Sequence, residues 1–165
     1  MSVGRFYAGI AALVRRSSDD KYLLLKRSED KDFGGGVWEC VTGRVDQEEG
    51  FEEALHREVR EEIGVAVDIE FVVGTSHFYR GVAKPENELV GITYCCALDD
   101  ADAVRISEEH SEYCWTRAEE ARQLLVADDP GTRWIGRVID RAEIIRAQLP
   151  GELTQFFRDN GFALD

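Results

Sequence analysis

The sequence predicts an α/β fold in which helices pack on both faces of a mixed β-sheet. Apolar segments of strand length alternate with segments of helical periodicity along the chain. The length of 165 residues favours one domain spanning residues 1–165, with a sizeable core. Hydrophobic residues make up 44% of the chain and charged residues 32%, which is ordinary for a globular protein.

The first part of the chain contains three expected strands. Residues 6–15 (FYAGIAALVR) are apolar and small enough for a buried strand, and a turn at 17–20 leads into a second strand at 21–27 (KYLLLKR). Three glycines at 34–36 end a loop, after which residues 37–42 (VWECVT) predict a short third strand.

An apolar residue at every fourth position predicts an amphipathic helix after this strand. Its apolar stripe consists of Phe51, Leu55, Val59 and Ile63, and Ala54 widens it. Gly64 follows the last periodic residue and suits a left-handed helix end.

The remaining elements alternate between strand and helix. Residues 65–79 are expected to be extended with a break at Gly74, and 88–98 (ELVGITYCCAL) predict another strand. A charged loop at 99–111 precedes a short strand at 112–116 and a helix at 118–126. After a chain break at Pro130 and Gly131, two C-terminal helices are expected at 133–148 and 152–160, within the segment 133–165.

Three glutamates of the first helix lie beside its apolar stripe. At 100° per residue, Glu58, Glu61 and Glu62 project from neighbouring faces, with Glu62 close to the stripe. Like charges at this spacing cost a helix about 0.2–0.5 kcal/mol per pair, and a bound divalent cation reverses that sign. A Glu-rich helix face is more often a solvated surface, so the spacing of the residues around it decides between the two interpretations.

Residues 43–65 (GRVDQEEGFEEALHREVREEIGV) match one spaced pattern at every defined position: Gly-x5-Glu-x7-Arg-Glu-U-x-Glu-Glu-x-Gly-U, where U is aliphatic. At average residue usage, a chance match has a probability of about one in ten million. This stretch resembles the Nudix box. The segments LLLKRSED and ISEEHSEYCWTRAEEA also resemble parts of Nudix hydrolases of nucleotides, which extends the resemblance over about residues 6–126.

The resemblance implies a Nudix-type α/β/α sandwich with a mixed central sheet and the box helix against one face. It also implies metal-dependent hydrolysis of a diphosphate linkage in a small nucleotide, with Mg²⁺ or Mn²⁺ as cofactor. The implied metal ligands are Glu58, Glu61, Glu62 and the backbone carbonyl of Thr42.

Two further box residues carry over as orienting groups, since the resemblance implies that Arg57 pairs with Glu49 and holds the loop onto the helix. The general base stays open between Glu58 and Glu109, because Nudix enzymes take it either from the box or from a later loop. We favour Glu58 narrowly, since the box is the stronger match, and Glu108 and Glu112 compete with Glu109.

Residues outside the box have weaker signals. Arg27 ends the second strand, where some Nudix enzymes place a phosphate-binding arginine, and an ordinary cation at a strand edge is an equal alternative. His110 is expected to be a surface histidine. Four aromatic residues could stack on a base, although core packing is expected for most of them: Trp38, Phe78, Tyr79 and Tyr113.

Charge and composition restrict the partners and the compartment. The net charge of -13 argues against a nucleic-acid partner and requires that a phosphorylated substrate meet metal or a local basic pocket. No apolar run approaches the roughly 20 residues of a membrane span, and no signal segment is recognisable, so a cytoplasmic protein without a membrane partner is expected. The four cysteines are expected to be reduced and buried, with Cys95 and Cys96 on opposite faces of a strand.

The main expectation is a nucleoside triphosphate or dinucleoside polyphosphate substrate. WECVTGRVD resembles dATP or dihydroneopterin triphosphate pyrophosphohydrolases, and EEHSEYCWTRAEEA resembles diadenosine polyphosphate hydrolases. ADP-ribose or a nucleotide sugar is an alternative, but Arg80 stands where ADP-ribose hydrolases carry a proline, with Pro85 further along. A non-catalytic nucleotide-binding or regulatory module is disfavoured by the intact box. Isopentenyl diphosphate isomerase is disfavoured because Thr42 replaces the cysteine before the box glycine.

Overall fold

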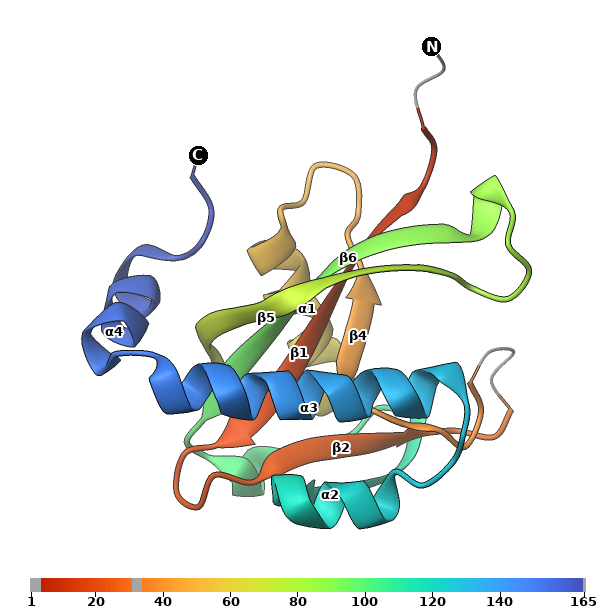
Figure 1. The fold of residues 1–165 in the computed structure, drawn as a ribbon. Helices are drawn as coiled ribbons and strands as arrows, with labels where there is room; N and C mark the ends of the chain where they lie inside the picture. The colour runs from red at the N-terminus through yellow and green to blue at the C-terminus, as the bar shows by residue number, and fades with distance from the viewer. Residues whose placement is uncertain (1–3, 31–33, 165) are drawn as a thin grey trace.

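A computed structural model, which describes residues 4–30 and 34–164, contains a seven-stranded mixed sheet (Figure 1). The strands are β1 (Tyr7–Arg16), β2 (Tyr22–Arg27), β3 (Trp38–Glu39), β4 (Val41–Arg44), β5 (Asp68–Tyr79), β6 (Glu88–Leu98) and β7 (His110–Thr116). Their order is β3-β2-β1-β6-β5, while β4 also pairs with β1 and β7 with β2. Strands β1 and β6 are parallel and the other pairs are antiparallel, so the predicted mixed sheet is confirmed.

Helices cover both faces of this sheet. They are α1 (Phe51–Ile63), α2 (Ala118–Leu124), α3 (Pro130–Gln148) and α4 (Gly151–Asn160). In Figure 1, α3 crosses the front of the sheet and α1 lies behind it. Short 3-10 helices occur at η1 (Pro85–Asn87) and η2 (Ala101–Ala103). This arrangement confirms the α/β/α sandwich.

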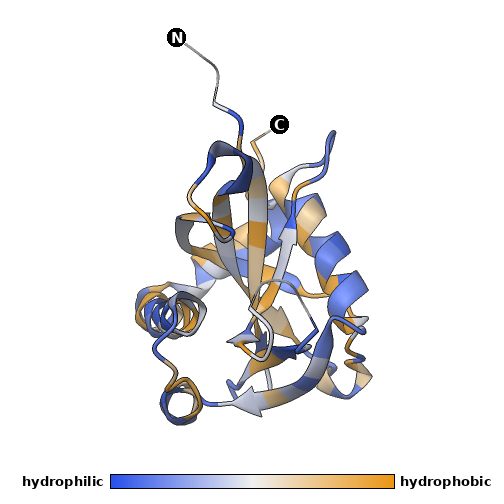
Figure 2. Ribbon diagram, turned by 90° about the vertical axis from the view of Figure 1, so that its right-hand side faces the viewer, coloured by the Kyte–Doolittle hydropathy of each residue, from blue (hydrophilic) through white to orange (hydrophobic). Residues whose placement is uncertain are grey.

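The side-chain alternation of β1 divides the core into two halves. Its residues Ile10, Ala12 and Val14 pack with the α1 stripe, whereas Ala11 and Leu13 pack with α2 and α3. The α1 stripe is buried as predicted at Leu55, Val59 and Ile63, while Phe51 at the helix start is 43% exposed. Figure 2 shows hydrophobic and hydrophilic bands alternating along the helices that flank the sheet.

Three of the boundaries that differ from the predicted ones have a clear local reason. The single strand expected at 37–42 is two strands, because β3 pairs with β2 and the chain then crosses at Cys40 so that β4 pairs with β1. Strand β7 begins at His110, since pairing with β2 continues to Arg27. Helix α3 begins at Pro130, because proline fits the first turn of a helix and Asp129 caps it through the Thr132 N–H at 2.9 Å.

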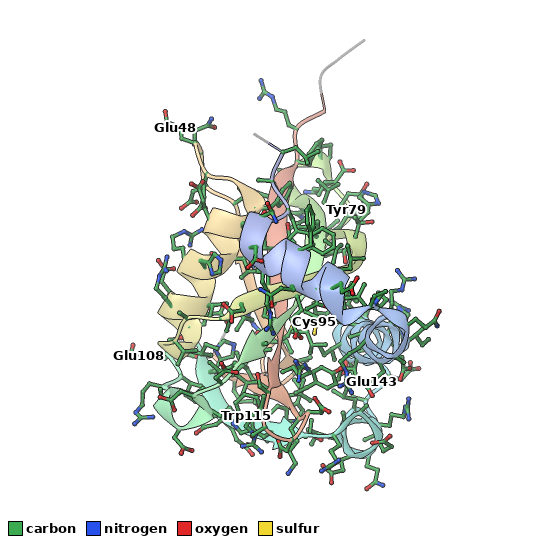
Figure 3. The ribbon with its side chains drawn as sticks, turned by 90° about the vertical axis from the view of Figure 1, so that its left-hand side faces the viewer. Glu48, Tyr79, Cys95, Glu108, Trp115 and Glu143 are labelled. Atoms are coloured by element: carbon green, nitrogen blue, oxygen red, sulfur yellow. The ribbon has the colours of Figure 1, made fainter. Side chains whose placement is uncertain are left out.

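The C-terminal segment returns to the box helix. Helix α4 lies between α1 and α3 in the view of Figure 3. Arg158 on α4 forms an ion pair of 2.9 Å with Glu70, a buried residue of β5. Beyond α4, the Phe162 N–H donates to the Glu52 carboxylate of α1 at 2.6 Å. The segment after α4 is therefore hydrogen-bonded to the first turn of α1.

The cysteines follow the prediction. All four are free thiols, and Cys40, Cys95 and Cys96 are buried while Cys114 is partly buried. Cys95 packs on the α3 side of β6, inside the molecule in Figure 3, and Cys96 packs on the α1 side. Among the described residues, no helix has the length and apolar character needed to cross a membrane.

Candidate active site

Helix α1 sets the direction of the box glutamates. It ends at Gly64, whose φ of 72° is the predicted left-handed conformation. Because the stripe is pressed against the sheet, the neighbouring side chains of Glu58 and Glu62 are only 15% and 8% exposed, whereas Glu61 points outward at 59%. The structure therefore directs two of the three predicted acids toward the sheet and leaves the third in solvent.

A larger residue at position 43 would displace the Glu58 side chain, which occupies the space where a Cβ atom would begin. A Cβ atom at Gly43 would lie 2.0 Å from the Glu58 carboxyl carbon. Thr42, the predicted carbonyl ligand, is the adjacent residue of β4. The Glu58 carboxylate and this part of the β4 backbone are thus brought together by the absence of one side chain.

Arg57 connects the box loop, the helix and the sheet. Its Nε and Nη2 donate to the two carboxylate oxygens of Glu49 at 2.8 and 2.9 Å, so the predicted pairing is confirmed. Its Nη1 donates to Glu58 at 2.8 Å, and its Nη2 also donates to the Arg44 carbonyl at 2.8 Å. The hydrogen bonds from Arg57 lower the pKa of Glu49, while burial raises the pKa of Glu58 against the opposing effect of Arg57.

Glu62 is the most constrained acid of the group. It is buried, and its Oε2 has no hydrogen-bond partner among the described residues. Burial raises the pKa of Glu62 to about 9, and the negative charges of Glu39, Glu58 and Glu109 act in the same direction. An ionised carboxylate in such a place is stabilised by a cation, because no hydrogen-bond donor of the described residues reaches its Oε2.

These observations fit a hard divalent cation. Carboxylate and carbonyl oxygens are the donors that Mg²⁺ and Mn²⁺ prefer. Within residues 4–30 and 34–164, no three His, Cys, Asp or Glu side chains already converge as a metal cluster. In this arrangement Glu58 and Glu61 contact Arg57 instead, at 2.8 and 3.2 Å. The buried Oε2 of Glu62 has no hydrogen-bond partner among the described residues, and it is the oxygen to which a cation would bind.

A second group of polar side chains reaches Glu62 from the sheet. Glu39 on β3 accepts a hydrogen bond from Arg27 at 3.0 Å and lies 3.2 Å from His110 Nε2, which is 3.9 Å from Glu62 Oε2. The expectation of a surface histidine was wrong, because pairing between β7 and β2 places His110 in the interior. Glu39 was missed, since nothing in the sequence near position 39 indicates that β3 lies opposite the box helix.

The three later acids that were considered as the base, Glu108, Glu109 and Glu112, differ in their surroundings. The charge of Glu109 contributes to the raised pKa of Glu62, so this residue lies near the site. Glu112 forms an ion pair of 3.6 Å with Lys26. Glu108 lies beyond the C-terminal end of α1 in Figure 3. Of the three, Glu109 is the one whose charge bears on Glu62.

The aromatic residues only partly follow the prediction. Trp38 packs against the core on the α3 side. Core packing was wrong for Phe78, Tyr79 and Tyr113, which are 40%, 36% and 40% exposed. Phe78 and Tyr79 lie at the end of β5, where Tyr79 is labelled in Figure 3, and Tyr113 lies in the middle of β7.

Comparisons with known proteins agree with the fold and the box. The NUDIX domain family matches residues 6–140. Nucleoside triphosphatase NudI of Escherichia coli O17:K52:H18 is 30% identical over 110 residues, which are 62% of this chain and 77% of that protein.

Two solved structures share the fold. The MutT protein of Methanosarcina mazei Go1 has a TM-score of 0.68 at 23% identity, covering 91% of this chain and 100% of its own. The Ap4A hydrolase of C. elegans, in a binary complex, has a TM-score of 0.67 at 21% identity, covering 87% of this chain and 99% of its own. With a family match over residues 6–140 and an intact box at residues 43–65, the chain belongs to the Nudix family and is a hydrolase of that family.

Proposed function

We propose that this protein hydrolyses a diphosphate linkage in a small nucleotide of the nucleoside triphosphate or dinucleoside polyphosphate class, with a divalent cation as cofactor. The observation that supports it most is the buried Glu62 carboxylate, which has an oxygen without a hydrogen-bond partner among the described residues and has neighbouring acidic charges. The names of the relatives support the substrate class, since one is a nucleoside triphosphatase and another an Ap4A hydrolase.

Each site residue expected from the sequence has a part in this proposal. The carboxylates of Glu58, Glu61 and Glu62 and the carbonyl of Thr42 would hold Mg²⁺ or Mn²⁺. When bound, the cation neutralises phosphate oxygens and lowers the pKa of water. To bind a cation, Glu61 would only have to rotate its side chain away from Arg57, because this side chain is mostly exposed.

Arg57 and Glu49 fix the box loop and the helix relative to each other through their bidentate ion pair. Arg27 is positioned by Glu39 and supplies positive charge for a substrate phosphate.

The covalent step is an in-line displacement at phosphorus. The oxygen of a water molecule forms a bond to phosphorus, the bridging P–O bond breaks, and the electron pair leaves with the departing phosphate. A carboxylate takes the proton of the water. We favour Glu58, whose raised pKa makes it a better base than an exposed glutamate, and Glu109 is the alternative.

Composition supports the rest of the proposal. The length of the chain supports a single domain spanning residues 1–165. The net charge of -13 supports a small-molecule partner rather than nucleic acid. We also propose a cytoplasmic location without a membrane partner.

The test is a screen of product release from nucleoside triphosphates, dinucleoside polyphosphates, nucleotide sugars and ADP-ribose, with Mg²⁺ and with Mn²⁺. Wild-type protein should turn over one of the first two classes, and Glu62→Gln should lose most of that activity. Turnover confined to ADP-ribose or nucleotide sugars would change the substrate class. Tight nucleotide binding without any turnover would instead favour the non-catalytic module.

A further inference from the structure

Three arginines lie at the ends of strands or directly after one, in a protein whose net charge is -13. Arg27 is the last residue of β2, Arg44 is the last residue of β4, and Arg80 directly follows β5. Arg44 is next to Gly43, the residue against which Glu58 packs. Arg44 therefore ends the strand that carries Thr42 and Gly43, and Arg27 contacts Glu39 of the site at 3.0 Å.

Arg44 is oriented by an aromatic ring. Its guanidinium carbon lies 4.6 Å from the ring centre of Tyr7, a cation–π contact at the start of β1. Tyr7 pairs with Leu89 of β6, which in turn pairs with Phe78 of β5, so the three side chains share one face of the sheet. Leu89 is buried, whereas the Tyr7 and Phe78 rings of this row are 42% and 40% exposed and remain open to a ligand.

Arg80 is held at the end of the same row. Its backbone N–H donates to the Asn87 carbonyl at 2.9 Å, across the β5–β6 connection. Burial lowers the pKa of the half-buried Arg80, and the like charges of Arg44 and Arg27 act in the same direction. Within the part of the chain that the structure describes, no carboxylate forms an ion pair with Arg80, and the nearby Glu39 is bound by Arg27.

A half-buried guanidinium among like charges is stabilised by an anion. The planar guanidinium donates two parallel hydrogen bonds to phosphate oxygens, which makes phosphate the ligand that best matches these groups. We propose that Arg80 and Arg44 bind phosphates of the substrate beyond the two that flank the hydrolysed bond. The protein then selects nucleotides with three or more phosphates over nucleoside diphosphate sugars. This inference rests on the proposed function.

The direct test is calorimetric binding of inorganic tripolyphosphate and of pyrophosphate in the presence of Mg²⁺. Wild-type protein should bind tripolyphosphate more tightly than pyrophosphate. Arg80→Gln should weaken tripolyphosphate binding about tenfold or more, as expected for the loss of hydrogen bonds to a charged group, and should leave pyrophosphate binding nearly unchanged. The matched control is Arg137→Gln, which removes the same charge from an exposed position of α3 and should bind both anions as wild type does.

A conservative variant and a kinetic measurement complete the test. Arg80→Lys should retain part of the tripolyphosphate affinity, and the thermal midpoints of both Arg80 variants show whether they are folded. In turnover, Arg80→Gln should raise KM for a nucleoside triphosphate more than for a nucleotide sugar. Unchanged tripolyphosphate binding in folded Arg80→Gln, or no binding by wild type, overturns the inference. If Arg80→Gln loses binding while wild type turns over no nucleotide, the proposed function fails and the phosphate site stands.

Discussion

Replacing Glu62 by glutamine should stabilise the metal-free protein at neutral pH, although it should abolish most of the activity. The Glu62 side chain is only 8% exposed, and its Oε2 has no hydrogen-bond partner among the described residues. Glutamine has almost the same shape and no charge. The variant therefore removes the cost of keeping this carboxyl protonated in the folded protein at neutral pH, and it opens no cavity.

The magnitude follows from the pKa. Burial raises the pKa of Glu62 from 4.5 to about 9 in the folded protein. Between these values the unfolded chain has released the proton and the folded chain retains it, so the free energy of unfolding falls as pH rises, by about 1.4 kcal/mol per pH unit. The Glu62 contribution is complete below pH 4.5 and is lost progressively toward pH 9. At pH 7, Glu62→Gln should be more stable than wild type by at most about 3 kcal/mol.

The assay is urea unfolding from pH 5 to pH 8.5 in excess chelator, with the difference between variant and wild type plotted against pH. Glu61→Gln is the matched control, because Glu61 is 59% exposed, and its difference from wild type should stay flat. Adding Mg²⁺ should then stabilise wild type more than Glu62→Gln, since a ligand stabilises the state that binds it. A difference between Glu62→Gln and wild type that does not change with pH would refute the reasoning about the buried carboxyl.

Four further outcomes concern activity. Chelation should abolish turnover and Mg²⁺ or Mn²⁺ should restore it, and full turnover in excess chelator would contradict the metal requirement. Gly43→Ala should displace the Glu58 carboxylate, whose carbon would lie 2.0 Å from the new Cβ, and lower kcat at least tenfold while far-UV circular dichroism stays native. Arg57→Ala should lower turnover about tenfold or more, as loss of a group that orients metal ligands does; wild-type turnover would show that its ion pair with Glu49 is dispensable. Glu58→Gln should lose about 10²–10⁴-fold in kcat if it is the base, and a larger, metal-independent loss in Glu109→Gln would transfer that role.

The sequence by itself determined the elements whose signals are local. The four-residue period from Phe51 to Ile63 and the glycine at 64 defined α1, and a strictly spaced pattern identified Glu58, Arg57 and their neighbours. Cys95 and Cys96 were placed on opposite faces from strand alternation alone. In each case the structure results from interactions between residues that are near in the chain. Periodicity and spacing in the sequence are therefore enough to predict it.

Tertiary structure decided what depends on contacts between distant segments. Glu39 and His110 lie 71 residues apart, and only the pairing of β2 with both β3 and β7 brings them together beside Glu62. The backbone position of Arg80 depends on the β5–β6 connection, and its pKa depends on burial and on charges contributed by two other strands. Burial of a polar group is a property of everything packed around it, and no local pattern in the chain records which distant strand supplies the neighbours.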